Sequence, residues 1–212
     1  MFRQAEGEAT MDVSLNAGTR VYNLDKPLVS GGYDSASIGF RCRMPVAGVY
    51  HNGFITAKHF ANTGDRIASN STQIGSCTIS YDVYDCAFVN VTNTNYAISN
   101  NIGNTGKYLM TIGFAAITQG GSIWKYGAAT YETNGTILNS SINISVGIYT
   151  RPDCFLSNYE SQDGDSGCTV YRPGMSYDQN LAGIHLGKEP NTLYSYAANS
   201  SNIVSLMNLT RY

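Results

Sequence analysis

The chain has 212 residues, a length that suits one large all-β domain or two small barrels sharing an interface. Only 13% of the residues are charged, and the formal net charge is -2, so composition gives no electrostatic reason to expect a nucleic acid or an acidic membrane as partner. No apolar run approaches the roughly 20 residues that span a bilayer, and the start, "MFRQAEGEAT", lacks a signal-peptide pattern.

The first 28 residues are more polar and less periodic than the rest, so we expect 1–28 to be an N-terminal extension or a prosegment remnant. After them, short apolar or alternating runs recur between clusters of Gly, Asn and Asp, among them "SIGFRCRM", "GVYHNGFITA", "DCAFVNV", "SIWKYGA" and "LAGIHLG". Their β-branched and aromatic content predicts closely spaced strands, as in barrels or sandwiches. Helix is scarce, and the best candidate is the end of the chain, "SSNIVSLMNL", where a Ser or Asn cap precedes apolar residues.

Five cysteines leave at least one thiol unpaired, which excludes a complete disulfide framework. Cys77 and Cys86 could face each other across a hairpin formed by "SCTISYDVYDCAFV". Geometry decides whether such a pair can bridge, because the two Cα atoms must lie within about 7 Å.

Three segments supply the residue types of a hydrolytic triad. His59 follows the strand-like run in "GFITAKHF", Asp85 begins another apolar run in "YDCAFV", and Ser166 lies in "GDSG". A serine hydroxyl is a poor nucleophile until a base such as imidazole removes its proton, and a buried carboxylate fixes the imidazole tautomer. Asp82 competes with Asp85 as the acid. The order His, Asp, Ser along the chain is the one used by chymotrypsin-like enzymes.

The glycines around the serine have a role in the same chemistry. Gly164 allows a tight turn, so that its own N–H and that of Ser166 converge on one point and form an oxyanion hole. Each such donor is worth roughly 3 kcal/mol of the barrier to reaction. Asp165 is then a structural acid that holds the loop.

These motifs resemble those of the trypsin-like (chymotrypsin-fold) serine endopeptidases, above all the secreted bacterial streptogrisins and alpha-lytic protease. The resemblance covers residues 28–207 and includes "LVSGG", "SIGFRCR", "GFITAKHF", "DCAFV", "SIWKYGAATYETNGTI" and "LAGIHLG" in the right order. It implies an all-β fold of two six-stranded antiparallel Greek-key barrels with a short C-terminal helix. The first barrel, 29–105, would carry the His and Asp, and the second, 106–212, the Ser, the oxyanion hole and the specificity pocket. "LVSGG" also implies a mature terminus near Val29.

The sequence departs from that family at several positions. Phe60 stands where the family has a Cys that braces the histidine loop, and Cys168 stands where most relatives have Gly. Cys154 matches a family half-cystine whose partner is missing here. Leu186 follows His185 where many relatives place a Ser that helps hold the catalytic Asp.

His185 implies an acidic preference. In glutamyl endopeptidases of this fold, a histidine on the matching strand binds the side-chain carboxylate of the residue before the scissile bond, helped by a hydroxyl. Here "GIHLG" supplies His185, and Ser161 lies where the helper would be, with Leu186 and Gly187 as further substrate-binding residues. Glu160 sits where trypsin has its pocket acid; pointing inward, it would favour Arg or Lys. A preference for a neutral or apolar side chain is the third alternative.

The sequence therefore predicts a secreted, monomeric serine endopeptidase that acts on peptides or proteins through His59, Asp85 and Ser166, with no metal or organic cofactor. One rival is a non-catalytic protein that kept the two-barrel fold for binding. Another is a secreted β-sandwich adhesin, suggested by the Asn, Ser and Thr content alone. A third keeps the chemistry in an intracellular or viral processing protease, for which unpaired thiols and an absent signal would be natural.

Overall fold

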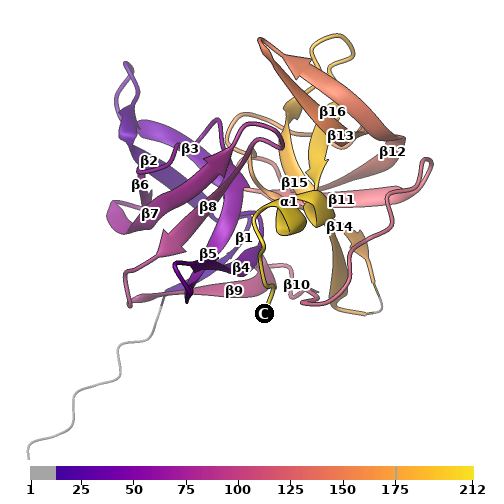
Figure 1. Ribbon diagram of the computed structural model, residues 1–212. Helices are drawn as coiled ribbons and strands as arrows, with labels where there is room; N and C mark the ends of the chain where they lie inside the picture. The colour runs from indigo at the N-terminus through magenta and orange to yellow at the C-terminus, as the bar shows by residue number, and fades with distance from the viewer. Residues whose placement is uncertain (1–12, 175) are drawn as a thin grey trace, which may run out of the picture.

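The computed structural model describes residues 13–174 and 176–212, which fold into two sheets lying side by side. In Figure 1 the first sheet, drawn in indigo to magenta, lies on the left, and the second, drawn in pink to yellow, lies on the right. The second sheet also includes two strands from the first half of the chain, β1 (Val13–Ala17) and β9 (Tyr96–Ile102), at one end of its strand order. Within the described residues, no helix is both long and apolar enough to cross a bilayer.

The first sheet closes into a barrel of six strands. Its order is β3-β2-β6-β7-β8-β5-β4, so β3 and β4 lie at opposite ends of the sheet although only residues 38–40 separate them along the chain. Because the Gly39 amide also donates to Ile55 O, the β3–β4 segment acts as one bent strand that closes the ring. The strand bounds are β2 Arg20–Pro27, β3 Tyr33–Ser37, β4 Arg41–Val46, β5 Val49–Ala57, β6 Arg66–Ser69, β7 Thr72–Tyr81 and β8 Cys86–Val91.

The second barrel also has six strands. They run in the order β15-β14-β11-β12-β13-β16, and β16 pairs back onto β15, which closes the ring. All pairings within this ring are antiparallel. The bounds are β11 Ser122–Gly127, β12 Tyr131–Val146, β13 Tyr149–Ser157, β14 Thr169–Pro173, β15 Asp178–Lys188 and β16 Ser195–Asn199. The predicted all-β architecture of two six-stranded barrels is confirmed.

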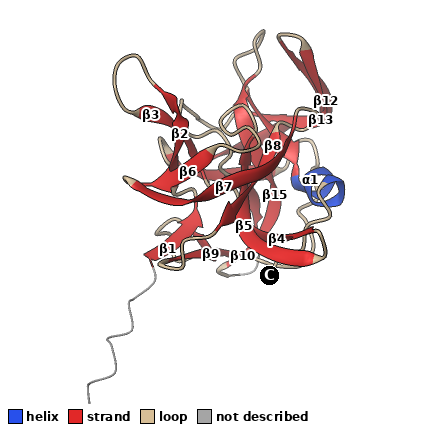
Figure 2. Cartoon of the chain, turned by 60° about the vertical axis from the view of Figure 1, so that its left-hand side comes forward, coloured by secondary structure: helices blue, strands red, loops and turns tan. Residues whose placement is uncertain are grey.

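Three short strands and one helix join the barrels. β1 (Val13–Ala17) pairs in parallel with β9 (Tyr96–Ile102), and β10 (Tyr108–Leu109) pairs with both β9 and β15. The helix α1 (Ser200–Leu206), drawn in blue in Figure 2, follows β16. Asn199 caps it, because its side chain accepts from the Ser201 amide, as the predicted polar cap requires.

The predicted N-terminal extension is wrong for residues 13–28. β2 pairs with β3 and β6 inside the first barrel, and Val21 is fully buried. "LVSGG" forms the turn of the β2–β3 hairpin, where the Leu28 amide donates to Gly32 O. Residues 1–12 lie outside the described part of the chain. The predicted boundary between 105 and 106 falls in the segment that links the barrels.

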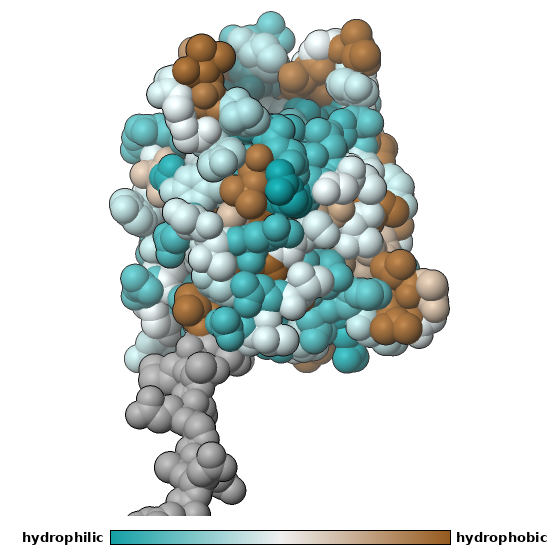
Figure 3. Space-filling model, turned by 90° about the vertical axis from the view of Figure 1, so that its left-hand side faces the viewer, coloured by the Kyte–Doolittle hydropathy of each residue, from teal (hydrophilic) through white to brown (hydrophobic). Residues whose placement is uncertain are grey.

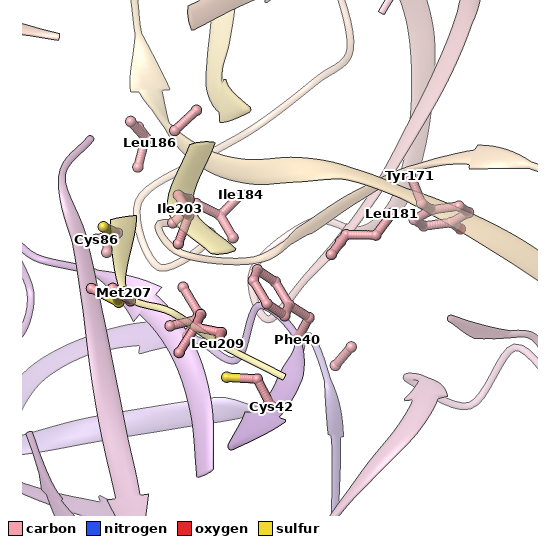
Figure 4. Packing of buried hydrophobic residues seen from close by; sticks show 14 of the residues in the cluster. Phe40, Cys42, Cys86, Tyr171, Leu181, Ile184, Leu186, Ile203, Met207 and Leu209 are labelled. Atoms are coloured by element: carbon pink, nitrogen blue, oxygen red, sulfur yellow. The ribbon is translucent and has the colours of Figure 1, made fainter. Parts of the chain in front are cut away.

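An apolar core joins the two barrels. Figure 4 shows Phe40 and Cys42 of the first barrel near Leu181 and Ile184 of the second, all within one buried cluster. Full burial of a large apolar side chain such as Phe40, Leu181 or Ile184 contributes roughly 1.5–3 kcal/mol to stability. The face in Figure 3 is mainly hydrophilic, with apolar residues in separate patches. The interface between the barrels is therefore a packed core that fixes their relative position.

All five cysteines are buried and unpaired. Cys77 lies opposite Val89 and Cys86 opposite Tyr81, so the hairpin register does not set the two cysteines across from each other. The suggested Cys77–Cys86 bridge is not formed. Burial raises the pKa of the Cys77 and Cys154 thiols to about 12.

Candidate active site

His59 lies in the turn that follows β5. The last five residues of β5 are buried, so the strand is fixed in the barrel and ends just before this turn. The His59 side chain is 41% exposed, whereas the next side chain, Phe60, is buried in the barrel core. Lys26 Nζ donates to the carbonyls of both residues at 2.8 Å, which ties the turn to β2. The imidazole therefore faces solvent from a fixed backbone.

Asp85 holds the His59 imidazole. It lies in the turn before β8, and its side chain is only 1% exposed. Oδ1 accepts from the His59 amide at 2.8 Å, and Oδ2 lies 2.7 Å from His59 Nδ1. Because an ionised carboxylate only accepts, Nδ1 carries the proton and Nε2 is left as a base. Asp82, the competing acid, instead pairs with Lys58 at 2.8 Å and is half exposed.

The loop that carries Ser166 joins β13 to β14 and docks on the first barrel. The Ser37 amide donates to Ser166 O at 2.8 Å, and Ser37 Oγ donates to Gly164 O at 2.7 Å. Gly167 packs so closely that an added Cβ would lie 2.3 Å from Thr56 Oγ1. Since Thr56 lies three residues before His59, this contact brings Ser166 to the end of β5 where the imidazole lies.

Two backbone amides near Ser166 are free to bind an anion. Gly164 has φ +96°, a left-handed conformation that favours glycine, and the Asp165 amide donates back to Gln162 O at 3.0 Å. Within the described part of the chain, the Gly164 and Ser166 amides donate to no protein acceptor. Paired unsatisfied N–H groups in one tight loop have the arrangement of an oxyanion hole.

Asp165 is fully buried and holds the loop from inside. Its carboxylate accepts from the amides of Ala129 and Gln162 and from Thr130, and it lies 3.1 Å from the buried Lys125 ammonium. Burial acts to raise the pKa of Asp165, but these hydrogen bonds and the Lys125 charge outweigh it, so the pKa is lowered. The loop thus forms around an ionised carboxylate.

A pocket of about 470 Å³ opens beside Ser166. Its lining includes His185, Ser161 and Gly187 of the predicted substrate-binding set, together with Gln162, Asp163 and Lys188. His185 is 2% exposed, and burial lowers its pKa to about 3. Tyr159 Oη lies 3.1 Å from His185 Nδ1. The imidazole is therefore neutral at ordinary pH, and donation from Tyr159 would leave Nε2–H as a donor.

Ser161 lines the pocket, whereas Leu186 and Glu160 do not. Ser161 Oγ lies 2.8 Å from Ser195 Oγ, which itself donates to Tyr159 O, so the Ser161 proton is engaged. Leu186 is the extra residue of a bulge in β15, and its side chain is buried in the apolar core. Glu160 is exposed and does not line the pocket, which removes the argument for a basic preference.

Three residues that complete the site, Lys125, Arg151 and Tyr159, were not predicted from the sequence. Lys125 had a signal, because it alternates with buried Ile123 in "SIWKYG" and so occupies an inward position of a strand. Arg151, whose guanidinium lies 2.7 Å from Asp85 Oδ2, follows a hairpin turn in "IYTRPD" and gives no such pattern. The Tyr159 contact depends on how the loop after β13 folds back onto β15.

Comparison with known proteins identifies the fold. Thermobifida fusca protease A has a TM-score of 0.74 at 21% identity, covering 94% of this chain and 98% of that chain. Cellulomonas bogoriensis chymotrypsin has a TM-score of 0.72 at 20%, covering 94% and 99%. A glutamic acid specific serine protease that uses a histidine triad in substrate binding has 0.71 at 19%, covering 93% and 100%. The chain thus has the chymotrypsin fold.

The chain matches no protein-family model, and comparison with curated proteins gives no significant match. At 21% identity, the likeness to Thermobifida fusca protease A shows the fold, and it extends over 94% of this chain.

We predict that Lys125→Met destabilises the protein by about 3–5 kcal/mol at pH 7, because it leaves the Asp165 carboxylate buried without its cation. The matched control is Lys107→Met, whose partly exposed pair with Glu132 should be worth under about 1 kcal/mol. Urea unfolding measures both.

Folding lowers the pKa of Asp165, so the ionised carboxylate stabilises the folded protein at pH values above its unfolded pKa of about 3.9. This contribution to stability is lost as the pH falls through the pKa of the folded state. The cost of Lys125→Met should accordingly be smaller at pH 3 than at pH 7. Equal losses in the two variants at pH 7 would contradict this account.

Proposed function

We propose that the protein is a serine endopeptidase that hydrolyses peptide bonds through an acyl-enzyme. The observation that carries the proposal is the His59–Asp85 pair, with Nδ1 2.7 Å from the carboxylate, at the end of β5 onto which the Ser166 loop docks. The free amides of Gly164 and Ser166 support it. The substrate would be a peptide or protein lying between the barrels.

Each group has a role that follows from its contacts. His59 Nε2 removes the proton from Ser166 Oγ as the hydroxyl attacks the carbonyl carbon, and Asp85 stabilises the imidazolium that results. The Gly164 and Ser166 amides bind the oxyanion of the tetrahedral intermediate. His59 then gives the proton to the leaving amine, and water repeats the cycle to release the acid. The backbone of β15 near Gly187 would pair with the substrate as an added strand.

We expect Ser166→Ala to abolish both peptide cleavage and covalent labelling by a fluorophosphonate, because the nucleophile is lost. The unfolding midpoint should be unchanged, since Ser166 Oγ holds no other part of the loop. Cleavage is followed by mass spectrometry on a peptide library. If the wild-type protein neither cleaves peptides nor reacts with the fluorophosphonate, the proposal is refuted and the non-catalytic binding protein is supported.

For the residue before the cut, we propose a side chain that ends in an oxygen acceptor, with Glu or Asp first. Neutral His185 offers one donor, and Lys188 at the pocket rim supplies the positive charge that the imidazole lacks. Asp163 opposes an anion there. Because a neutral N–H also suits an amide carbonyl, Gln is the closest competitor.

Matched peptides that differ only in the residue before the cut test this specificity. We expect Glu and Gln to be cleaved at least about 10-fold faster than Phe or Lys, because a buried donor is left unpaired by those side chains. Tyr159→Phe should reduce this preference roughly 10-fold by freeing the His185 tautomer, while Tyr177→Phe, an exposed control, should not. Equal rates after Phe and Gln would refute the pocket assignment.

Secretion of this protein stays a prediction. The second candidate is an intracellular or viral processing protease, and the five unpaired thiols favour it. Five cysteines without a disulfide are usual in a reducing compartment and unusual in small secreted enzymes. Burial and raised thiol pKa values would also keep them from reacting in the folded protein.

The number of thiols distinguishes these compartments. We expect the protein isolated without reductant, then denatured, to take up five iodoacetamide groups by mass, the same number as after reduction. If fewer than five iodoacetamide groups are added before reduction, some cysteines form disulfides, and a secreted enzyme is favoured instead.

A further inference from the structure

The triad acid has a second buried partner. Arg151 lies near the start of β13, directly after the β12–β13 hairpin turn, and its side chain is 9% exposed. One guanidinium nitrogen lies 2.7 Å from Asp85 Oδ2, the same oxygen that contacts His59 Nδ1. Another donates to the hydroxyl of Tyr196 in β16. The contact therefore crosses from the second barrel to the first.

Asp85 needs such a partner because it is almost fully buried. A buried carboxylate is costly unless its oxygens are paired and hydrogen-bonded. In the proteases that the sequence resembles, a serine after the position of His185 helps hold the acid. Leu186 stands there in this chain and packs into the apolar core, so it offers no hydrogen bond. The Arg151 guanidinium contacts the Asp85 carboxylate from another strand.

Other nearby cations are engaged elsewhere. Lys58 pairs with Asp82 at 2.8 Å, and Lys26 donates to the carbonyls of His59 and Phe60. Among the described residues, Arg151 is thus the one cation in contact with the Asp85 carboxylate. Tyr196 in turn holds the guanidinium, so its direction is fixed by β16.

We propose that Arg151 is a positioning residue of the active site: it holds the Asp85 carboxylate aimed at His59, and so makes the triad depend on contact between the barrels. This inference rests on the proposed endopeptidase function. The guanidinium touches neither substrate nor the reacting atoms, so its effect must pass through the Asp85–His59 hydrogen bond. Losing it should slow the chemical step and leave substrate binding largely intact.

We expect Arg151→Ala to lower kcat by roughly 10²- to 10³-fold with KM changed less than about threefold, because a misdirected triad acid impairs the base while the pocket stays intact. Arg151→Lys should recover part of the rate, and methylguanidinium added to Arg151→Ala should restore at least about 10-fold. Arg172→Ala is the control, since its guanidinium donates to Ala116 O and forms no ion pair with any carboxylate in the described part of the chain. It should keep wild-type kcat and not respond to methylguanidinium.

A second readout does not need activity. The His59 Nδ1 proton, held between nitrogen and carboxylate, should give a low-field proton NMR signal that is absent in Asp85→Asn. We expect the signal to be lost or shifted in Arg151→Ala and retained in Arg172→Ala. Wild-type kcat, or an unchanged signal, in folded Arg151→Ala would overturn the positioning role. A wild-type chain with the signal but without cleavage would instead count against the endopeptidase function alone.

Discussion

The buried carboxylate of Asp165 is the constraint on which the candidate site depends. A charge with no exposed surface must have its oxygens satisfied, and here they are satisfied by the Lys125 ammonium, a threonine hydroxyl and backbone amides from two separate loops. These bonds hold the backbone of the Ser166 loop in the observed conformation. In that shape the Gly164 carbonyl turns toward Ser37, and the Gly164 and Ser166 amides remain unpaired.

Asp85 repeats the arrangement on the other barrel. Both acids are buried, and each is paired with a cation on the second barrel, Lys125 for Asp165 and Arg151 for Asp85. The Lys125 pair organises the serine side within one barrel, whereas the Arg151 pair crosses the interface to the histidine side. Because an apolar core fixes the two barrels, both pairs can form without moving either one.

The sequence predicts the features that follow from residue type and local pattern. Alternating strands, the capped C-terminal helix and the order His, Asp, Ser are all readable, because strand period, capping chemistry and nucleophilic catalysis each demand particular residues. β2 was missed because only two positions of "RVYNLDKP" are fully buried, and one of them, Asn23, is polar, so the segment lacks the apolar alternation of a core strand. Arg151 was missed because a buried cation contradicts the hydrophobic pattern and is explained only by a partner 66 positions earlier.

The strand that sequence analysis assigned to an extension also holds the histidine turn. In the resembling proteases a disulfide braces that loop, whereas here Phe60 fills the position and packs into the barrel. Asn23 and Lys26 of β2 both donate to Phe60 O, and Lys26 also donates to His59 O. These bonds exist only while β2 is paired with its neighbours, whereas a disulfide would survive local unfolding. The position of His59, the base of the proposed mechanism, is thus tied to the folded state of the first barrel, and a chain cut at Val29 would lose the strand that fixes it.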